Sequence, residues 1–270
     1  GDAMITNPER RGSIIHYRAF SDSSVRFNDS FSTYLPQDEA ALCVAAGAGW
    51  VAVASNHNYL RIFSSTGLQL AAIAISGPVV ALPSHGTQLG VLYHSGGPLS
   101  STGFISADLY EIDEKQVPAK IISVPRVPLS ADSSLTWTGF DSAKGTLATM
   151  DSAGVLSILL RSCGWQWVPV LDSALESRQK MAADSRTKKW WPVTVKSEKI
   201  YYVVLGNDQI SPNAATQPIV SSCEFNFTQL VGDNATSSDL KADLVLQAAK
   251  ARHWEAMRRD HWVEEYYTLA

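Results

Sequence analysis

The chain has 270 residues, of which 45% are hydrophobic and 18% charged, and its formal net charge is −4. This composition excludes a disordered chain and is sufficient for a sizeable buried core. Nucleic-acid-binding domains usually carry a basic face, so the acidic balance argues against DNA as the main partner. No apolar run approaches the roughly 18 residues that a membrane span needs, and no membrane partner is predicted.

Three cysteines, Cys43, Cys163 and Cys223, lie far apart and form no CxxC pair. The spacing predicts neither a disulfide framework nor a zinc site, and it favours a reducing compartment. The N-terminus lacks the features of a signal peptide. Gly1-Asp2-Ala3-Met4 resembles the remnant of a cleaved tag, which predicts a domain of a longer protein.

From residue 42 to about 227, short β-rich runs alternate with turn clusters. The first group of expected strands covers 42–45, 50–54, 59–63 and 69–75. The second covers 79–82, 88–93, 108–112 and 120–124. The third covers 135–140, 146–150, 155–160 and 167–171. The fourth covers 191–195, 200–205 and 219–227.

Turns of similar sequence separate the strands of the third group. Residues 141–145 and 151–154 both begin with Asp-Ser-Ala and end with Gly, which is typical of hairpins. Groups of four antiparallel strands that begin roughly 40 to 50 residues apart are typical of propeller blades. We therefore predict an all-β fold, a β-propeller, with a β-sandwich or two small barrels as alternatives. The strand-like segment 14–20 completes another blade or helps to close the ring.

The sequence changes character at a polar linker, residues 232–238, beyond which no Gly or Pro occurs. This predicts a C-terminal α-helical segment at 238–270, after a propeller domain at 13–231. One apolar stripe runs along the expected helix. Its residues, the predicted partner-binding set, are Leu240, Leu244, Ala248, Ala251 and Trp254. The alternative is that this stripe packs on the chain's own propeller.

No specific catalytic motif is present in the sequence. Residues 47–52 fit the GxGxxA pattern, but they precede an expected strand instead of opening a helix, so we interpret them as a hairpin turn. The sequence contains no GxSxG, P-loop or HExxH motif. We accordingly predict no catalytic residue, no metal ligand, no cofactor and no enzymatic activity.

Two alternative functions stay open on the residues alone. The first is a propeller enzyme, a hydrolase or lyase, with its site in the central channel. Its candidate residues are His57, His85, His94, Asp108, Asp141 and Asp151. The second is direct DNA binding by a basic patch of Arg178, Lys180, Arg186, Lys188 and Lys189. Trp191, which follows this patch, is expected in a strand core.

Several phrases along the expected strands resemble a known domain when they are taken in order. They are Gly49-Trp50-Val51-Ala52-Val53-Ala54, Tyr59-Leu60-Arg61-Ile62-Phe63, Gly77-Pro78-Val79-Val80-Ala81, Gly86-Thr87-Gln88-Leu89, Trp137-Thr138-Gly139-Phe140, Trp165-Gln166-Trp167-Val168-Pro169-Val170 and Trp191-Pro192-Val193. This order resembles the SepB domain of the chromosome transmission fidelity replisome-hub family, which includes the vertebrate WD-repeat and HMG-box protein. The resemblance runs over roughly residues 13 to 228.

The resemblance implies a six-bladed propeller that assembles into a homotrimer in the nucleus. It implies a scaffold that links the replicative helicase, through GINS, to DNA polymerase alpha-primase and to other clients that carry short peptides. It further implies a role in DNA replication and sister-chromatid cohesion. Residues 240–246 can be laid on the family's first C-terminal helix, whereas the remainder of the expected helix departs from the family pattern.

Overall fold

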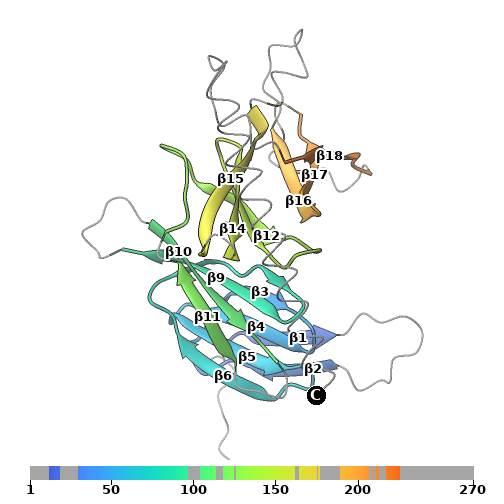
Figure 1. Cartoon of the computed structure of the whole chain (residues 1–270). Helices are drawn as coiled ribbons and strands as arrows, with labels where there is room; N and C mark the ends of the chain where they lie inside the picture. The colour runs from blue at the N-terminus through green and yellow to red at the C-terminus, as the bar shows by residue number, and fades with distance from the viewer. Residues whose placement is uncertain are drawn as a thin grey trace, which may run out of the picture. The chain divides into compact units, whose positions relative to one another are not determined.

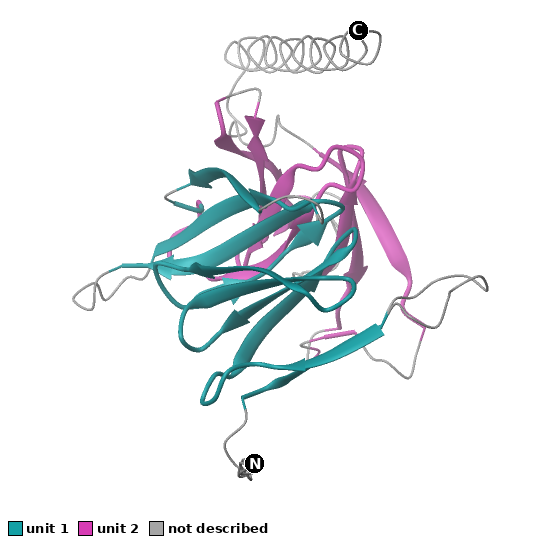
Figure 2. Cartoon of the chain, turned by 90° about the horizontal axis from the view of Figure 1, so that it is seen from below, with its two compact units in different colours: residues 1–127 teal, residues 128–270 magenta. Residues whose placement is uncertain are grey.

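The structure is a computed structural model that describes residues 12–18, 30–96, 104–113, 118–124, 126–161, 164–174, 176, 189–206, 209, 211–212 and 217–225. The chain divides into two compact units, Gly1–Val127 and Pro128–Ala270 (Figure 2). The elements with defined bounds in the described ranges are the β-strands β1 to β18, and every pair of neighbouring strands is antiparallel (Figure 1).

Unit 1 contains a sheet of four consecutive strands in the order β3-β4-β5-β6. Their bounds are Ala41–Ala46, Trp50–Ser55, Tyr59–Ser64 and Gln69–Ala74. All six residues of β4 are buried, whereas β3 alternates between covered and exposed positions. This pattern is expected of a meander whose central strands are covered on both faces.

A second sheet of unit 1 has the order β11-β10-β9-β7, with the two-residue strand β8 also paired to β9. The bounds are Val79–Ala81 for β7, Ser84–His85 for β8, Gln88–Ser95 for β9, Phe104–Glu111 for β10 and Ala119–Val124 for β11. Trp50 and Leu60 of the first sheet share a hydrophobic cluster with Leu89 and Val91 of the second. Trp50 is fully buried, and its indole Nε1 donates to the carbonyl of Gly86 at 3.1 Å.

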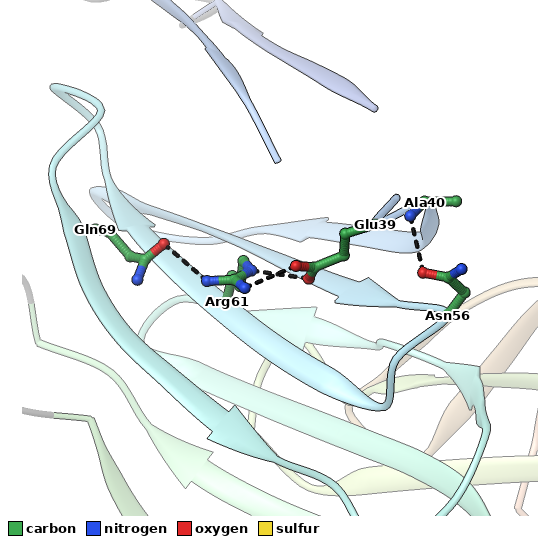
Figure 3. A network of polar contacts seen from close by, with 5 residues as sticks. All are labelled: Glu39, Ala40, Asn56, Arg61 and Gln69. Atoms are coloured by element: carbon green, nitrogen blue, oxygen red, sulfur yellow. Dashed lines mark hydrogen bonds and ion pairs between the residues drawn. The ribbon is translucent and has the colours of Figure 1, made fainter. Parts of the chain in front are cut away.

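A two-stranded sheet of β1 (Ile14–Arg18) and β2 (Ser30–Tyr34) completes the described part of unit 1. Its inner residue Ile15 clusters with Val51, Val53 and Phe63 of the β3–β6 sheet. The backbone N–H of Ser13 donates to the carbonyl of Glu39 at 3.0 Å. Figure 3 shows the polar network around Glu39, which secures the connection from β2 to β3.

Unit 2 contains a four-stranded sheet in the order β12-β13-β14-β15 and a three-stranded sheet in the order β16-β17-β18. The first comprises Leu135–Phe140, Leu147–Asp151, Val155–Leu160 and Gln166–Asp172. The second comprises Trp190–Lys196, Lys199–Val204 and Val220–Glu224. One hydrophobic cluster joins them and includes Leu156 and Leu171 from the first sheet and Ile200 and Tyr202 from the second.

Four-stranded antiparallel meanders are the blades of a β-propeller, so the predicted all-β, β-propeller fold class is confirmed. The hairpin interpretation of residues 47–52 is also confirmed, because Gly49 turns between β3 and β4 with φ 81°. The expected count of six blades stays a prediction. The expected helix at 238–270 lies outside the described residues.

Two strand predictions need correction in unit 1. β10 begins at Phe104 and not at residue 108, because β9 extends to Ser95 and Phe104 pairs with it. The short strand β8 was not expected, since a two-residue strand leaves no periodic signal in the sequence. Across the described residues, the structure holds no helix that is long and apolar enough to cross a membrane.

Candidate interaction surfaces

The residues proposed for a channel enzyme divide into exposed histidines and buried aspartates. His57, His85 and His94 are all exposed, whereas the three aspartates are buried. In the part of the chain that the structure describes, no group of three or more His, Cys, Asp or Glu side chains could hold a metal ion.

Asp108 lies in the middle of β10, and both of its carboxylate oxygens accept hydrogen bonds from neighbouring side chains. Its Oδ2 accepts a hydrogen bond from Lys120 Nζ at 2.6 Å, and Tyr93 donates its hydroxyl to Oδ1 at 3.4 Å. Burial lowers the pKa of Lys120, but its hydrogen bonds and charge interactions with Asp108 and Tyr110 together outweigh this, so the pKa is raised overall. Lys120 therefore stays charged at neutral pH, and its ammonium group forms an ion pair with a buried side chain of the sheet.

Asp151 closes the turn between β13 and β14. Its Oδ2 accepts hydrogen bonds from the backbone N–H of Ser130 at 2.8 Å and the hydroxyl of Ser133 at 3.3 Å, and its Oδ1 accepts from the backbone N–H of Val155 at 2.9 Å. Burial raises the pKa of Asp151, but these hydrogen bonds outweigh it and lower the pKa overall. The carboxylate of Asp151 therefore has a structural role, because it binds the backbone N–H groups of Ser130 and Val155.

Asp141 has the same kind of task at the opposite end of the β12–β13 hairpin. Its Oδ1 accepts hydrogen bonds from the backbone N–H groups of Ala143 at 2.8 Å and of Ser197 at 3.3 Å. Asp141 and Asp151 therefore do not converge on one site. The two turns have similar sequences because the first aspartate of each accepts hydrogen bonds from backbone N–H groups.

The basic patch proposed for DNA is only partly visible. Arg178, Lys180, Arg186 and Lys188 lie outside the described residues, and Lys189 is exposed immediately before β16.

The prediction that Trp191 lies in a strand core is wrong. Neighbouring strand residues point to opposite faces, and here Trp190 faces inward and stacks on Tyr202 with ring centroids 3.7 Å apart. Trp191 is 42% exposed.

Exposed apolar side chains lie on and beside the three-stranded sheet of unit 2. We call them together the β16–β18 apolar surface, and its residues are Trp191, Val193, Val204, Ile219 and Val220. The strand register puts Trp191 and Val220 on the face of Val203, and Val204, opposite Trp190, on the other face. Ile219 is the most exposed of them, at 84%. Within the described residues β18 pairs with β17 alone, so it is an edge strand of this sheet. Apolar edges of this kind favour pairing with another chain.

Strand β3 of unit 1 carries a smaller exposed apolar pair, Leu42 and Val44, which are 53% and 64% exposed. Sequence reasoning missed both surfaces, because residues 41–46 are apolar throughout and no alternation shows which side chains face outward. The predicted partner-binding residues Leu240, Leu244, Ala248, Ala251 and Trp254 lie outside the described residues.

Comparison with known proteins reveals several relatives. The chain is 28% identical to the Arabidopsis thaliana protein ENHANCER OF LHP1 1 over 260 residues, which is 95% of this chain and 25% of that protein. It is 37% identical to the Xenopus laevis WD repeat and HMG-box DNA-binding protein 1 over 139 residues, 52% of this chain and 12% of the relative. It is 27% identical to the Schizosaccharomyces pombe minichromosome loss protein 1 over 213 residues, 75% of this chain and 24% of the relative.

The chain therefore spans a quarter or less of the length of these three relatives. A family model described as the middle region of the minichromosome loss protein Mcl1 matches residues 3–227. This match contains every strand that the structure describes. The chain belongs to the family of the Mcl1 middle region.

Proposed function

We propose that this chain is a non-catalytic scaffold domain of the DNA-replication machinery that acts in the nucleus. In this proposal it forms a homotrimer that links the replicative helicase, through GINS, to DNA polymerase alpha-primase and other clients that carry short peptides, and it supports sister-chromatid cohesion. The observation that carries the proposal is the family match over residues 3–227. The names of the relatives, minichromosome loss protein 1 and WD repeat and HMG-box DNA-binding protein 1, support a role on chromosomes.

The described surfaces suit a scaffold better than an enzyme. The buried carboxylates Asp108, Asp141 and Asp151 are each used to hold the chain's own groups. The apolar side chains of the β16–β18 apolar surface, by contrast, are exposed on and beside β18, the edge strand of the sheet in the described residues. Protein partners, and not a small substrate, are what such an edge recognises.

We assign the contact between copies to the β16–β18 apolar surface. Pairing of the β18 edge with a neighbouring copy would cover Ile219 and Val220, which are 84% and 52% exposed in the single chain. Three copies would then present three identical client sites, and a multivalent partner would gain avidity from the raised effective concentration. The segment 238–270 is proposed as a separate helical domain whose stripe from Leu240 to Trp254 receives clients.

The oligomer is tested by replacing one residue of this surface. We expect Val220→Asp to shift the solution mass from trimer to monomer, because a carboxylate would be buried without a partner in the contact. Leu68→Asp is the matched control, since Leu68 is 66% exposed in unit 1 and lies outside the β16–β18 apolar surface. A trimer that survives Val220→Asp and Ile219→Asp would contradict the assignment of the interface.

The client proposal has its own test. Purified GINS and polymerase alpha-primase are each passed over the immobilised chain, with a length-matched β-propeller of another family as the control surface. The proposal expects both to be retained together in one complex. Retention of neither would contradict the linking function, whatever the mass of the chain.

A further inference from the structure

The side chains on the outer face of the β1–β2 hairpin change from apolar at one end to cationic at the other. This arrangement fits an anionic peptide. Alternation places Ile14, His16 and Arg18 on the outer face of β1, and all three are exposed. The residues opposite them on β2 are Tyr34, Ser32 and Ser30, in that order, and they too are exposed. The face therefore consists of three cross-strand pairs that run from apolar to hydroxyl-rich and cationic.

An open hollow lies at the cationic end of the hairpin and is bordered by residues of both faces. A cavity of about 340 Å³ is lined by His16, Tyr17, Arg18, Ser30, Phe31 and Ser32. None of these six residues is acidic. Arg18 is exposed, and no ion pair of Arg18 occurs in the described part of the chain. Directly opposite residues of an antiparallel pair lie about 5 Å apart, so the hydroxyl of Ser30 stands beside Arg18.

The histidine of this cavity is oriented by its neighbour. His16 Nδ1 and the hydroxyl of Ser32 are 2.7 Å apart. When the serine donates to Nδ1, the ring proton of a neutral imidazole resides on Nε2, which can then donate to a ligand. Arg18, Ser30 and His16 together supply a planar donor fork, a hydroxyl and a ring N–H around one hollow. This set suits a tetrahedral oxyanion.

The other end of the same face is apolar, and it determines which class of anionic ligand fits the whole face. Ile14 and Tyr34 are 41% and 51% exposed and lie opposite each other. They stand four residues along the strand from Arg18, which is about 13 Å at the rise of a β-strand. An extended peptide with an anionic residue at one end and an apolar residue about four positions away would cover both ends. A nucleic-acid backbone would present further phosphates to this apolar end.

We propose that the outer face of the β1–β2 hairpin binds an extended, phosphorylated segment of a protein partner, with the phosphomonoester in the cavity between Arg18 and Ser30 and an apolar side chain on Ile14 and Tyr34. This inference rests on the proposed function for the class of partner, which is a client protein. It makes the recruitment of that client dependent on phosphorylation. The hairpin is held from its inner face by Ile15 and Phe31, so a ligand on the outer face would not require the core to repack.

The test measures fluorescence anisotropy of labelled peptides with the full chain. The probe is an extended peptide with one phosphoserine and a leucine four positions away, and the comparison is the same peptide without phosphate. We expect the phosphopeptide to bind at least tenfold more tightly. Arg18→Gln should remove this preference, and Tyr34→Ser should weaken both peptides by a similar factor. Arg126→Gln, which changes an exposed arginine over the ring of Phe104 in the same unit, is the matched control and should bind as the unaltered chain does.

Competitors separate the sources of the anion. Inorganic phosphate should displace the phosphopeptide only weakly, because it lacks the apolar contact. Equal binding of both peptides, or a phosphate preference that survives Arg18→Gln, would overturn the proposal. Arg18-dependent binding of a single-stranded oligonucleotide in place of the peptide would also overturn it, in favour of nucleic acid. Measuring the solution mass of the Arg18→Gln variant in parallel distinguishes this failure from failure of the scaffold proposal, since that mass should not change.

Discussion

Glu39 and Arg61 form a two-point ion pair inside unit 1 (Figure 3). Arg61 Nε donates to Glu39 Oε1 at 2.8 Å, and Arg61 Nη2 donates to Glu39 Oε2 at 2.7 Å. The side chain of Glu39 is 2% exposed and that of Arg61 is 14% exposed. Arg61 also donates to Gln69 at 3.3 Å, so the pair joins the segment before β3 to β5 and β6. The buried charge pair therefore fixes the segment before β3 against the β3–β6 sheet.

Replacing Glu39 with Gln should destabilise the domain by about 3 kcal/mol, because it leaves the covered guanidinium of Arg61 without a counter-charge. The measurement is the free energy of unfolding in urea. Lys199→Met is the matched control, since its ion pair with Glu224 is on the surface. We expect no measurable change for Lys199→Met. Equal effects of the two substitutions would contradict the structural role of the Glu39 pair.

The same pair should make stability depend on pH on the acid side. The hydrogen bond from Arg61 lowers the pKa of Glu39 below its ordinary value. A carboxyl whose folded pKa is lowered contributes stability above its unfolded pKa and loses it as the pH falls through the folded pKa. The free energy of unfolding should therefore decline from about pH 5 downward, and it should decline less steeply in Glu39→Gln. Parallel curves for the two proteins would show that Glu39 is not the group responsible.

Trp50→Phe tests the link between the first two sheets of unit 1. The substitution removes the indole donor to Gly86 and part of a fully buried ring. The backbone N–H of Ala48 still donates to that carbonyl at 2.7 Å, so no acceptor is left unsatisfied. We expect a loss of about 1–2 kcal/mol for Trp50→Phe and about 4 kcal/mol for Trp50→Ala, measured by urea unfolding. A loss below the error of the measurement for Trp50→Ala would refute this anchoring role.

Asp151→Asn should cost more than its small change in shape suggests. Both oxygens of Asp151 accept hydrogen bonds, whereas an amide offers one oxygen and would point its NH₂ group at a donor. We expect about 2 kcal/mol of destabilisation, measured as a shift of the thermal midpoint and as unfolding free energy. Asp132→Asn is the control, because Asp132 is exposed and asparagine tolerates its φ of 54°. A comparable loss of stability in Asp132→Asn would show that the hydrogen bonds of Asp151 to the backbone are not the cause of the destabilisation.

Strand periodicity and turn residues predicted most of the fold. β12 and β14 lie at the predicted residues, because glycine and aspartate turns bound them on either side. The order of groups of four was also predicted. The extension of β10 back to Phe104 was not, since Phe104 pairs with Ser95 across a Gly-, Pro- and Ser-rich stretch, residues 96–103, whose sequence favours a loop.

The surfaces were harder to predict than the strands. An all-apolar strand such as 41–46 gives no sign of which residues face outward, and the tandem tryptophans Trp190 and Trp191 could be assigned to faces only by the observed register with β17. The ion pair of Glu39 with Arg61 joins residues 22 positions apart, and its partners carry no motif. The stripe from Leu240 to Trp254 remains a sequence prediction.

The most direct test of the account is the solution mass of the chain, measured by light scattering after gel filtration across a range of concentrations. The single chain has a mass of 29.3 kDa. The account predicts a stable mass of three chains that Val220→Asp reduces to one. A mass of one chain at every concentration would contradict the trimeric scaffold.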